Sequence, residues 1–221
     1  MTVTLTARAL LFDMDGTLVD STATVERVWA GFAERHGVDL TELLAFSHGR
    51  QTLDTVERFL PDADAATQRR EVDGLVGGEH EGSDDIVEIP GAAALLAAVE
   101  ALPEARVAIV TSAPHALALA RIRGAGLPVP EVLVAADDVA TGKPSPEGYL
   151  RAAELLGVEP GDCIVFEDAG AGLEAGRASG ATVVVVGDHA GPAADGLARI
   201  ADYTDVRVAA ADDGRIALTF G

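Results

Sequence analysis

Four groups of polar residues stand directly behind short apolar runs, where they could do chemistry together. They are Asp13 and Asp15 after ALLF (9–12), Thr111 and Ser112 after VAIV (107–110), Lys143 in the loop after VLVA (132–135), and Glu167 and Asp168 after CIVF (163–166). If these runs are parallel strands of one sheet, their carboxyl ends meet at the same edge. The groups would then form one site with several carboxylates, two hydroxyls and one ammonium.

Carboxylates crowded at one point repel each other, so a hard cation with oxygen ligands is needed, and a small number of protein ligands favours Mg²⁺ over Ca²⁺. Such an ion attracts phosphate, and phosphoryl transfer requires a positioned nucleophile, charge neutralisation and a proton for the leaving group. Asp13 can attack phosphorus, and Asp15 can donate the proton. Thr111 and Ser112 can bind phosphoryl oxygens, and Lys143 can offset the growing negative charge.

The elements that must position these groups alternate along the chain. The apolar runs, with a fifth at 182–186, suit strands that are buried on both faces. Helical patterns lie between them, with Pro at or near the start and Gly past the end, at 91–102, 114–124, 146–156 and 170–179. This alternation predicts an α/β fold with a doubly wound parallel sheet.

Residues 17–89 interrupt the alternation with helical patterns. These patterns predict four helices, at 22–36, 40–46, 51–60 and 63–76. An insertion directly after the first strand would lie above the carboxyl edge of the sheet and cover the site. We therefore expect a core domain made of 1–16 and 90–221, and a helical cap domain made of 17–89.

The C-terminal segment alternates in polarity on both sides of an Asp-Gly turn. It reads VRVAAADDGRIALTF at 206–220. This pattern predicts a β-hairpin, which we expect to close an edge of the sheet.

Composition limits the possible partners. The formal net charge of −20 and the lack of a basic patch argue against nucleic acid as a ligand. No apolar run is long enough to span a membrane, and the N-terminus lacks a secretion signal, so we expect a cytoplasmic protein. A monomer with a mobile cap is the simplest expectation for its oligomeric state. The only lysine among the 16 basic residues is Lys143, and the single cysteine, Cys163, lies in an apolar run typical of a buried thiol.

Four segments together resemble the ordered motifs of haloacid dehalogenase-type phosphatases. They are LFDMDGTLVDS (11–21), VTSAP (110–114), GKPSPEGY (142–149) and FEDAGAG (166–172). The resemblance spans 10–187 and implies a strand order of 3-2-1-4-5, a helical cap and a small phosphorylated metabolite as substrate. It implies that Asp13 forms an aspartyl-phosphate and that Asp15 acts as general acid and then activates water. It also implies that Mg²⁺ is bound by the Asp13 carboxylate, the Asp15 carbonyl and Asp168, with Glu167 as a direct or water-mediated ligand.

Several specificities exist within this family. A dehalogenase is disfavoured because Asp15 is present, and a phosphosugar mutase because Val25 stands where mutases carry His and because the cap has no lysine. The segment FSHGRQTLDTVERFLPD (46–62) resembles the cap loop of sugar-phosphate and polyol-phosphate phosphatases, including those for glycerol phosphate and deoxyglucose phosphate. His48 and Arg50 would then face the substrate; the alternative is a solvated turn between helices. Phosphoglycolate phosphatase stays open as a competing specificity.

Two readings from other classes fit less well. An EF-hand requires Gly and Glu where this sequence has Leu18 and Thr24. A dinucleotide-binding module would use the glycine-rich turn at 170–176 and an acid such as Asp188 after the next strand. The glycine spacing is unusual for that module, and Glu167 and Asp168 would face a pyrophosphate, so we retain it only as a remote alternative.

Overall fold

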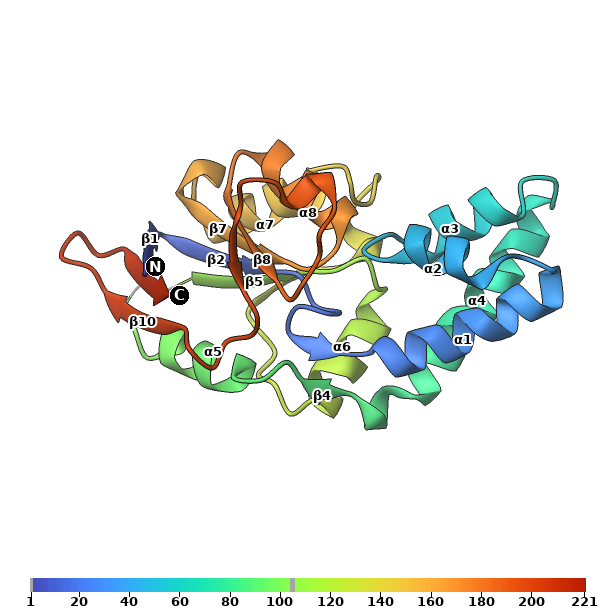
Figure 1. Cartoon of the computed structure of the whole chain (residues 1–221), viewed down its shortest axis with the longest axis horizontal. Coiled ribbons are helices and arrows are strands. Elements are labelled where there is room, and N and C mark those ends of the chain that lie inside the picture. Colours follow the sequence, from blue (N-terminus) through green and yellow to red (C-terminus); the bar gives the residue numbers. More distant parts are fainter. Residues whose placement is uncertain (1, 104–105) are drawn as a thin grey trace.

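The computed structural model describes residues 2–103 and 106–221 and contains a central six-stranded parallel sheet (Figure 1). The strands are β2 (Ala9–Phe12), β5 (Arg106–Val110), β6 (Val132–Val134), β7 (Cys163–Glu167), β8 (Thr182–Val186) and β9 (Ala198–Ile200). They lie in the order β6-β5-β2-β7-β8-β9. Numbered along the chain this is 3-2-1-4-5-6, which confirms the predicted order and adds a sixth strand, β9.

Helices cover both faces of this sheet. In Figure 1, α7 (Glu147–Leu156) and α8 (Gly170–Ser179) lie above the sheet, and α5 (Ala92–Glu100) and α6 (His115–Gly124) lie below it. Strand β2 has all four residues buried. Ala9 and Leu11 belong to the cluster on the α7 and α8 side, whereas Leu10 and Phe12 belong to the cluster on the other side. Continuous apolar runs are required because both faces of each strand are covered.

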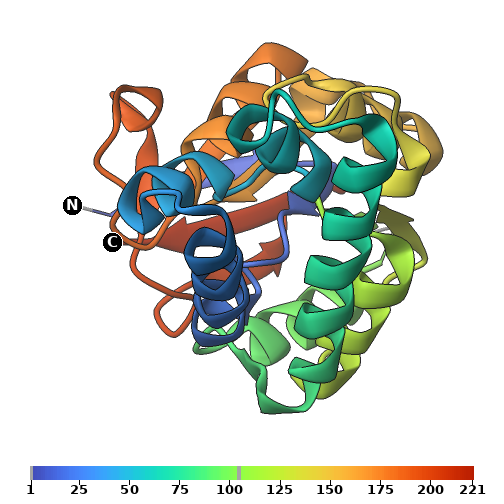
Figure 2. The ribbon, with the colours of Figure 1, turned by 90° about the vertical axis from the view of Figure 1, so that its right-hand side faces the viewer.

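Four helices lie beyond the carboxyl ends of the central strands and are named here the cap helices (Figures 1 and 2). They are α1 (Thr22–His36), α2 (Leu40–Ser47), α3 (Thr52–Phe59) and α4 (Ala65–Glu81). The predicted helices are all present, but α4 continues past the predicted end at 76. The cap helices share a hydrophobic cluster of their own, built around Trp29, Phe32 and Leu43.

Local sequence signals fix several cap-helix ends. Asp39 accepts a hydrogen bond from the backbone N–H of Glu42 at 2.8 Å, and Asp64 accepts one from Thr67 at 2.7 Å. These aspartates satisfy N–H groups that lack a partner in the first turn of α2 and α4. Gly37 follows α1 with φ of 65°, a conformation that glycine adopts without steric cost.

The two connections to the cap helices run side by side. Strand β3 (Val19–Asp20) pairs antiparallel with β4 (Val87–Glu88), and Val19 lies opposite Glu88. The sequence pattern did not reveal these strands because each has only two residues. Short 3₁₀ helices lie at Ser83–Asp85, Ala136–Asp138, Pro160–Asp162 and Pro192–Ala194.

The predicted C-terminal hairpin is present as β10 (Arg207–Ala210) and β11 (Ile216–Phe220). The prediction that it closes the parallel sheet is wrong, because β11 pairs antiparallel with β1 (Val3–Ala7) in a separate sheet of order β1-β11-β10. The buried residues of β11, such as Leu218, pack into the cluster on the α5 and α6 side of the core. In the described ranges, 2–103 and 106–221, no helix has the length and apolar character to cross a membrane.

Candidate active site

Asp13 and Lys143 join the ends of three strands. The backbone N–H of Asp13 donates to the carbonyl of Phe166 at 3.0 Å, which fixes the residue behind β2 and beside β7. The Lys143 ammonium donates to Asp13 Oδ1 at 2.5 Å, to Glu167 Oε1 at 2.6 Å and to the Val110 carbonyl at 3.1 Å. Both Asp13 and Lys143 are buried. The convergence expected from the strand ends is therefore present at the carboxyl ends of β2, β5 and β7.

Glu167 is held through both of its carboxylate oxygens. Oε1 also accepts a hydrogen bond from the Tyr149 hydroxyl at 2.8 Å, and Oε2 accepts from the backbone N–H groups of Asp168 and Ala169 at 3.1 and 3.2 Å. A Cβ at Gly172 would lie 1.6 Å from Glu167 Oε1. The glycine-rich turn is thus explained by the close approach of a carboxylate, and not by a need to accommodate a pyrophosphate.

Asp168 completes a compact carboxylate group. Its Oδ1 accepts a hydrogen bond from Thr17 Oγ1 at 2.9 Å. Oxygens of Asp13, Glu167 and Asp168 lie within 4.8 Å of one another, close enough to hold one cation. Gly16, with φ of 81°, is required here because a Cβ would lie 2.1 Å from Asp168 Oδ2.

The electrostatics of this group favour a cation. Burial raises the pKa of Asp13 well above its ordinary value; Lys143 opposes this rise, whereas Glu167 and Asp168 add to it. Burial and the charge of Glu167 raise the pKa of Asp168 to about 7. Burial alone would lower the pKa of Lys143, but Asp13 and Glu167 outweigh it and raise that pKa, so the ammonium is retained. One ammonium does not compensate three carboxylates, and a hard divalent ion fits this donor set.

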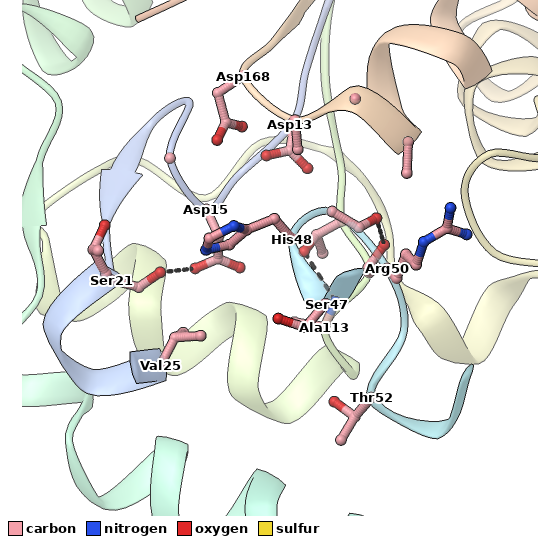
Figure 3. A pocket seen from close by; sticks show the side chains of 18 of the residues that line it. Asp13, Asp15, Ser21, Val25, Ser47, His48, Arg50, Thr52, Ala113 and Asp168 are labelled. Carbon is pink, nitrogen blue, oxygen red and sulfur yellow. Dashed lines mark hydrogen bonds between the residues drawn. The ribbon is translucent and has the colours of Figure 1, made fainter. Parts of the chain in front are cut away.

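Asp15 points into the same site but has other partners (Figure 3). Its Oδ1 accepts a hydrogen bond from Ser21 Oγ at 2.6 Å. Its Oδ2 accepts one from Arg121 Nη1 at 2.8 Å. Arg121 Nη2 donates to Glu79 Oε2 at 2.9 Å. The sequence analysis gave no role to Ser21, although it ends the segment 11–21, and it missed Glu79 and Arg121, because no motif or spacing distinguishes these two from ordinary helix residues.

A cavity of about 690 Å³ separates these residues from the cap helices. Its wall includes Asp13, Asp15, Thr111, Ser112 and Asp168 from the sheet edge, and Val25, Ser47, His48, Arg50 and Glu79 from the cap helices and the loop between α2 and α3. That loop is seated on the core, because Ser112 Oγ donates to the Gly49 carbonyl at 2.8 Å. A Cβ at Gly49 would lie 2.8 Å from the Cβ of Ala169, so only glycine permits this approach.

His48 and Arg50 both line the cavity but point in different directions. In Figure 3 the His48 ring projects into the pocket on the side of Asp15 and Ser21, whereas the Arg50 guanidinium extends to the opposite side. That guanidinium lies 4.6 Å from the centre of the Phe46 ring. The structure thus gives the two predicted cap residues different positions, with His48 directed toward Asp15.

Comparisons with known proteins agree with this architecture. The family described as haloacid dehalogenase-like hydrolase matches residues 7–180. Hexitol phosphatase A of Escherichia coli K12 is 44% identical over 184 residues, which cover 81% of this chain and 82% of that protein. 2-Deoxyglucose-6-phosphate phosphatase 1 of Saccharomyces cerevisiae is 37% identical over 196 residues, which cover 79% and 77%.

Among solved structures, a β-phosphoglucomutase from Clostridium difficile superposes with a TM-score of 0.75 at 23% identity, covering 82% of this chain and 85% of that one. This similarity concerns the fold alone. The family match extends over most of the chain, and the relatives resemble it over most of their own length. The chain therefore belongs to the haloacid dehalogenase-like hydrolases.

Proposed function

We propose that this protein is a magnesium-dependent phosphatase that hydrolyses a small sugar or polyol phosphate through an aspartyl-phosphate intermediate. The observation that carries the proposal is the buried Asp13 carboxylate, bonded to Lys143 and close to Asp168, on the wall of a 690 Å³ cavity. A cavity of this size suits a small molecule. The relatives named for hexitol and deoxyglucose phosphates support the substrate class.

The proposed Mg²⁺ would be held by the carboxylates of Asp13 and Asp168 and by the Asp15 carbonyl. Both oxygens of Glu167 already accept hydrogen bonds, so we propose that Glu167 contacts the ion through a water molecule. It would also hold the Lys143 ammonium in place through their hydrogen bond. When bound, the ion neutralises charge on the phosphoryl oxygens.

In the first step, a carboxylate oxygen of Asp13 attacks phosphorus while the bond between phosphorus and the leaving oxygen breaks. The Lys143 ammonium lowers the repulsion between the anionic nucleophile and the anionic substrate. Thr111 and Ser112, on the cavity wall with Asp13, bind phosphoryl oxygens, for which the Ser112 hydroxyl must exchange the Gly49 carbonyl for a phosphoryl oxygen. Asp15 transfers a proton to the leaving oxygen, so the product alcohol departs neutral.

In the second step, water attacks the phosphorus of the aspartyl-phosphate. The Asp15 carboxylate accepts a proton from this water, and the bond between phosphorus and the Asp13 oxygen breaks. Inorganic phosphate leaves, Asp13 returns as a carboxylate and Asp15 is again protonated for the next cycle.

We further propose that residues 17–89 act as a cap domain over a core made of 1–16 and 90–221. The loop that carries His48 and Arg50 would contact the leaving group, since it faces the cavity opposite the carboxylates. A monomeric state and a cytoplasmic location stay predictions of the sequence.

Release of inorganic phosphate in the presence of Mg²⁺ tests the proposal, with a panel of hexose, hexitol, pentose, polyol and glycolate phosphates. We expect the highest kcat/KM for a hexitol, polyol or deoxyhexose phosphate, and no phosphate release by Asp13→Asn. A clear preference for phosphoglycolate would replace the sugar or polyol assignment. Failure of the folded, Mg²⁺-loaded protein to hydrolyse any phosphate on the panel would overturn the proposal.

A further inference from the structure

Arg121 forms a buried bridge between the core and a cap helix. It lies on α6, and its guanidinium donates through Nη1 to Asp15 and through Nη2 to Glu79 on α4. The side chain of Arg121 is 3% exposed and that of Glu79 is 7% exposed. No sequence motif and no step of the proposed reaction accounts for this pair.

The bridge depends on α4 lying against α6. The two helices are in contact, and Glu79 reaches Arg121 from the last turns of α4. Burial raises the pKa of Glu79, with Arg121 opposing that rise and Asp15 adding to it. The contact with the guanidinium thus offsets part of the cost of burying the Glu79 carboxylate. Removal of one partner from such a pair leaves an uncompensated buried charge.

The contact with Arg121 restricts the orientation of Asp15. Ser21 donates to one carboxylate oxygen and Arg121 to the other, so rotation of the carboxylate breaks at least one hydrogen bond. Each oxygen has a second lone pair, which leaves room for the proton that a general acid must carry. Because both Nη atoms of Arg121 already contact carboxylates, the geometry favours orientation of Asp15 over direct recognition of substrate.

We propose that Arg121 is a positioning residue, which orients the Asp15 carboxylate for proton transfer while Glu79 holds the guanidinium from the cap side. Proton transfer to the leaving group then depends on the packing of α4 against α6, because this packing brings Glu79 to Arg121. The inference rests on the proposed phosphatase function, in which Asp15 is the general acid.

A series of aryl phosphates with increasingly basic leaving groups separates this role from a purely structural one. A leaving group that departs as a stable phenolate needs little help from a proton donor. An alcohol leaving group would depart as a strongly basic alkoxide, so its oxygen must be protonated as the bond to phosphorus breaks. We expect Arg121→Gln to lower kcat/KM by about 10–100-fold for the best polyol phosphate, a part of the ~10²–10⁴-fold that general acid catalysis supplies. The kcat/KM for p-nitrophenyl phosphate should stay nearly unchanged, because kcat/KM reports phosphoryl transfer to Asp13 and not the later attack of water that Asp15 also assists. The dependence of kcat/KM on leaving-group basicity then becomes steeper.

Arg121→Gln leaves Glu79 buried without its partner, so the double variant Arg121→Gln/Glu79→Gln is measured beside it. The double variant removes the unpaired charge and should regain thermal stability, yet keep the same loss toward basic leaving groups. Arg123→Gln is the matched control, since Arg123 is exposed on the same helix.

The outcomes are distinct. Equal losses in kcat/KM for all leaving groups, recovery of kcat/KM for the polyol phosphate in the double variant, or a change confined to KM would each overturn the positioning role. A wild-type protein that hydrolyses none of the phosphates would instead refute the proposed function. Steeper dependence in both Arg121 variants, with Arg123→Gln unchanged, supports the inference.

Discussion

Replacement of Lys143 by Met is the most direct test of the charge arrangement at the nucleophile. The substitution keeps a long, flexible side chain of similar size but removes the ammonium. Nζ donates to Asp13 Oδ1 at 2.5 Å and to Glu167 Oε1 at 2.6 Å, so both carboxylates lose their closest cationic partner. An uncharged residue at this position leaves an anionic nucleophile to approach an anionic phosphate without compensation.

The expected loss of kcat depends on which of the two Lys143 hydrogen bonds acts on the attacking oxygen. Hydrogen bonds to charged groups contribute about 1.5–3 kcal/mol each, but only the one to Asp13 acts on the attacking carboxylate. Deletion of one charge-stabilising donor at a reacting centre costs about 2.7–4 kcal/mol, and we expect kcat of Lys143→Met to fall about 10²–10³-fold. Folding should be destabilised by less than the ~3–5 kcal/mol of a broken buried pair, because a carboxylate that has lost Lys143 can take up a proton.

The assay is kcat for the best substrate at saturating Mg²⁺, with melting temperature as the folding control. Tyr149→Phe is the matched comparison, since it removes a 2.8 Å hydrogen bond to the same Glu167 oxygen but keeps the ammonium. Its kcat should change by less than about tenfold. Lys143→Arg should rescue poorly, because a planar guanidinium does not reproduce a compact point charge. A folded Lys143→Met variant within about threefold of the parent kcat would refute the reasoning.

Three further predictions test the rest of the site. Asp13→Asn should abolish turnover with the fold intact, because an amide cannot attack phosphorus; a residual kcat above about 1% of the parent value would contradict the assignment of Asp13 as nucleophile. His48→Ala should lower kcat/KM for the best polyol phosphate more than Arg50→Ala, with p-nitrophenyl phosphate little affected in both, since only the His48 ring projects toward Asp15; a larger effect of Arg50 would reverse their assigned roles. Without Mg²⁺ the melting temperature should fall as pH rises from about 4 to about 7, because folding raises the pKa of Asp168 from 3.8 to about 7 and the folded state then binds the extra proton. Added Mg²⁺ should raise the melting temperature more at about pH 8 than at about pH 5, and an equal rise at both would argue against binding by these carboxylates.

Local patterns were enough to predict the sheet and the convergence of its chemical groups. Continuous apolar runs identify strands buried on both faces, and their alternation with helices predicts a doubly wound parallel sheet. The strand order itself came from the resemblance to haloacid dehalogenase-type phosphatases. Asp13, Glu167 and Asp168 follow these strands directly in sequence, so they meet once the order is known. Lys143 stood out because it is the only lysine in the chain.

The C-terminal hairpin shows what a local sequence pattern cannot predict. Alternation around an Asp-Gly turn predicts two paired strands but not the strand to which they add. In the structure β11 pairs with β1, and Leu5 lies opposite Leu218. This pairing buries the apolar face of β11 against the hydrophobic core, whereas pairing with an edge strand of the parallel sheet was expected.

The sequence alone determined which residues gather at the sheet edge, because connectivity and strand burial decide that. Only the tertiary structure decided which partners hold Asp15. Arg121 is 106 positions from Asp15 and 42 from Glu79, and the three meet only because α4 packs on α6. The direction of His48, away from that of Arg50, is likewise seen only in the folded structure. Contacts of this kind depend on how packed surfaces fit together, and short-range spacing carries no record of that fit.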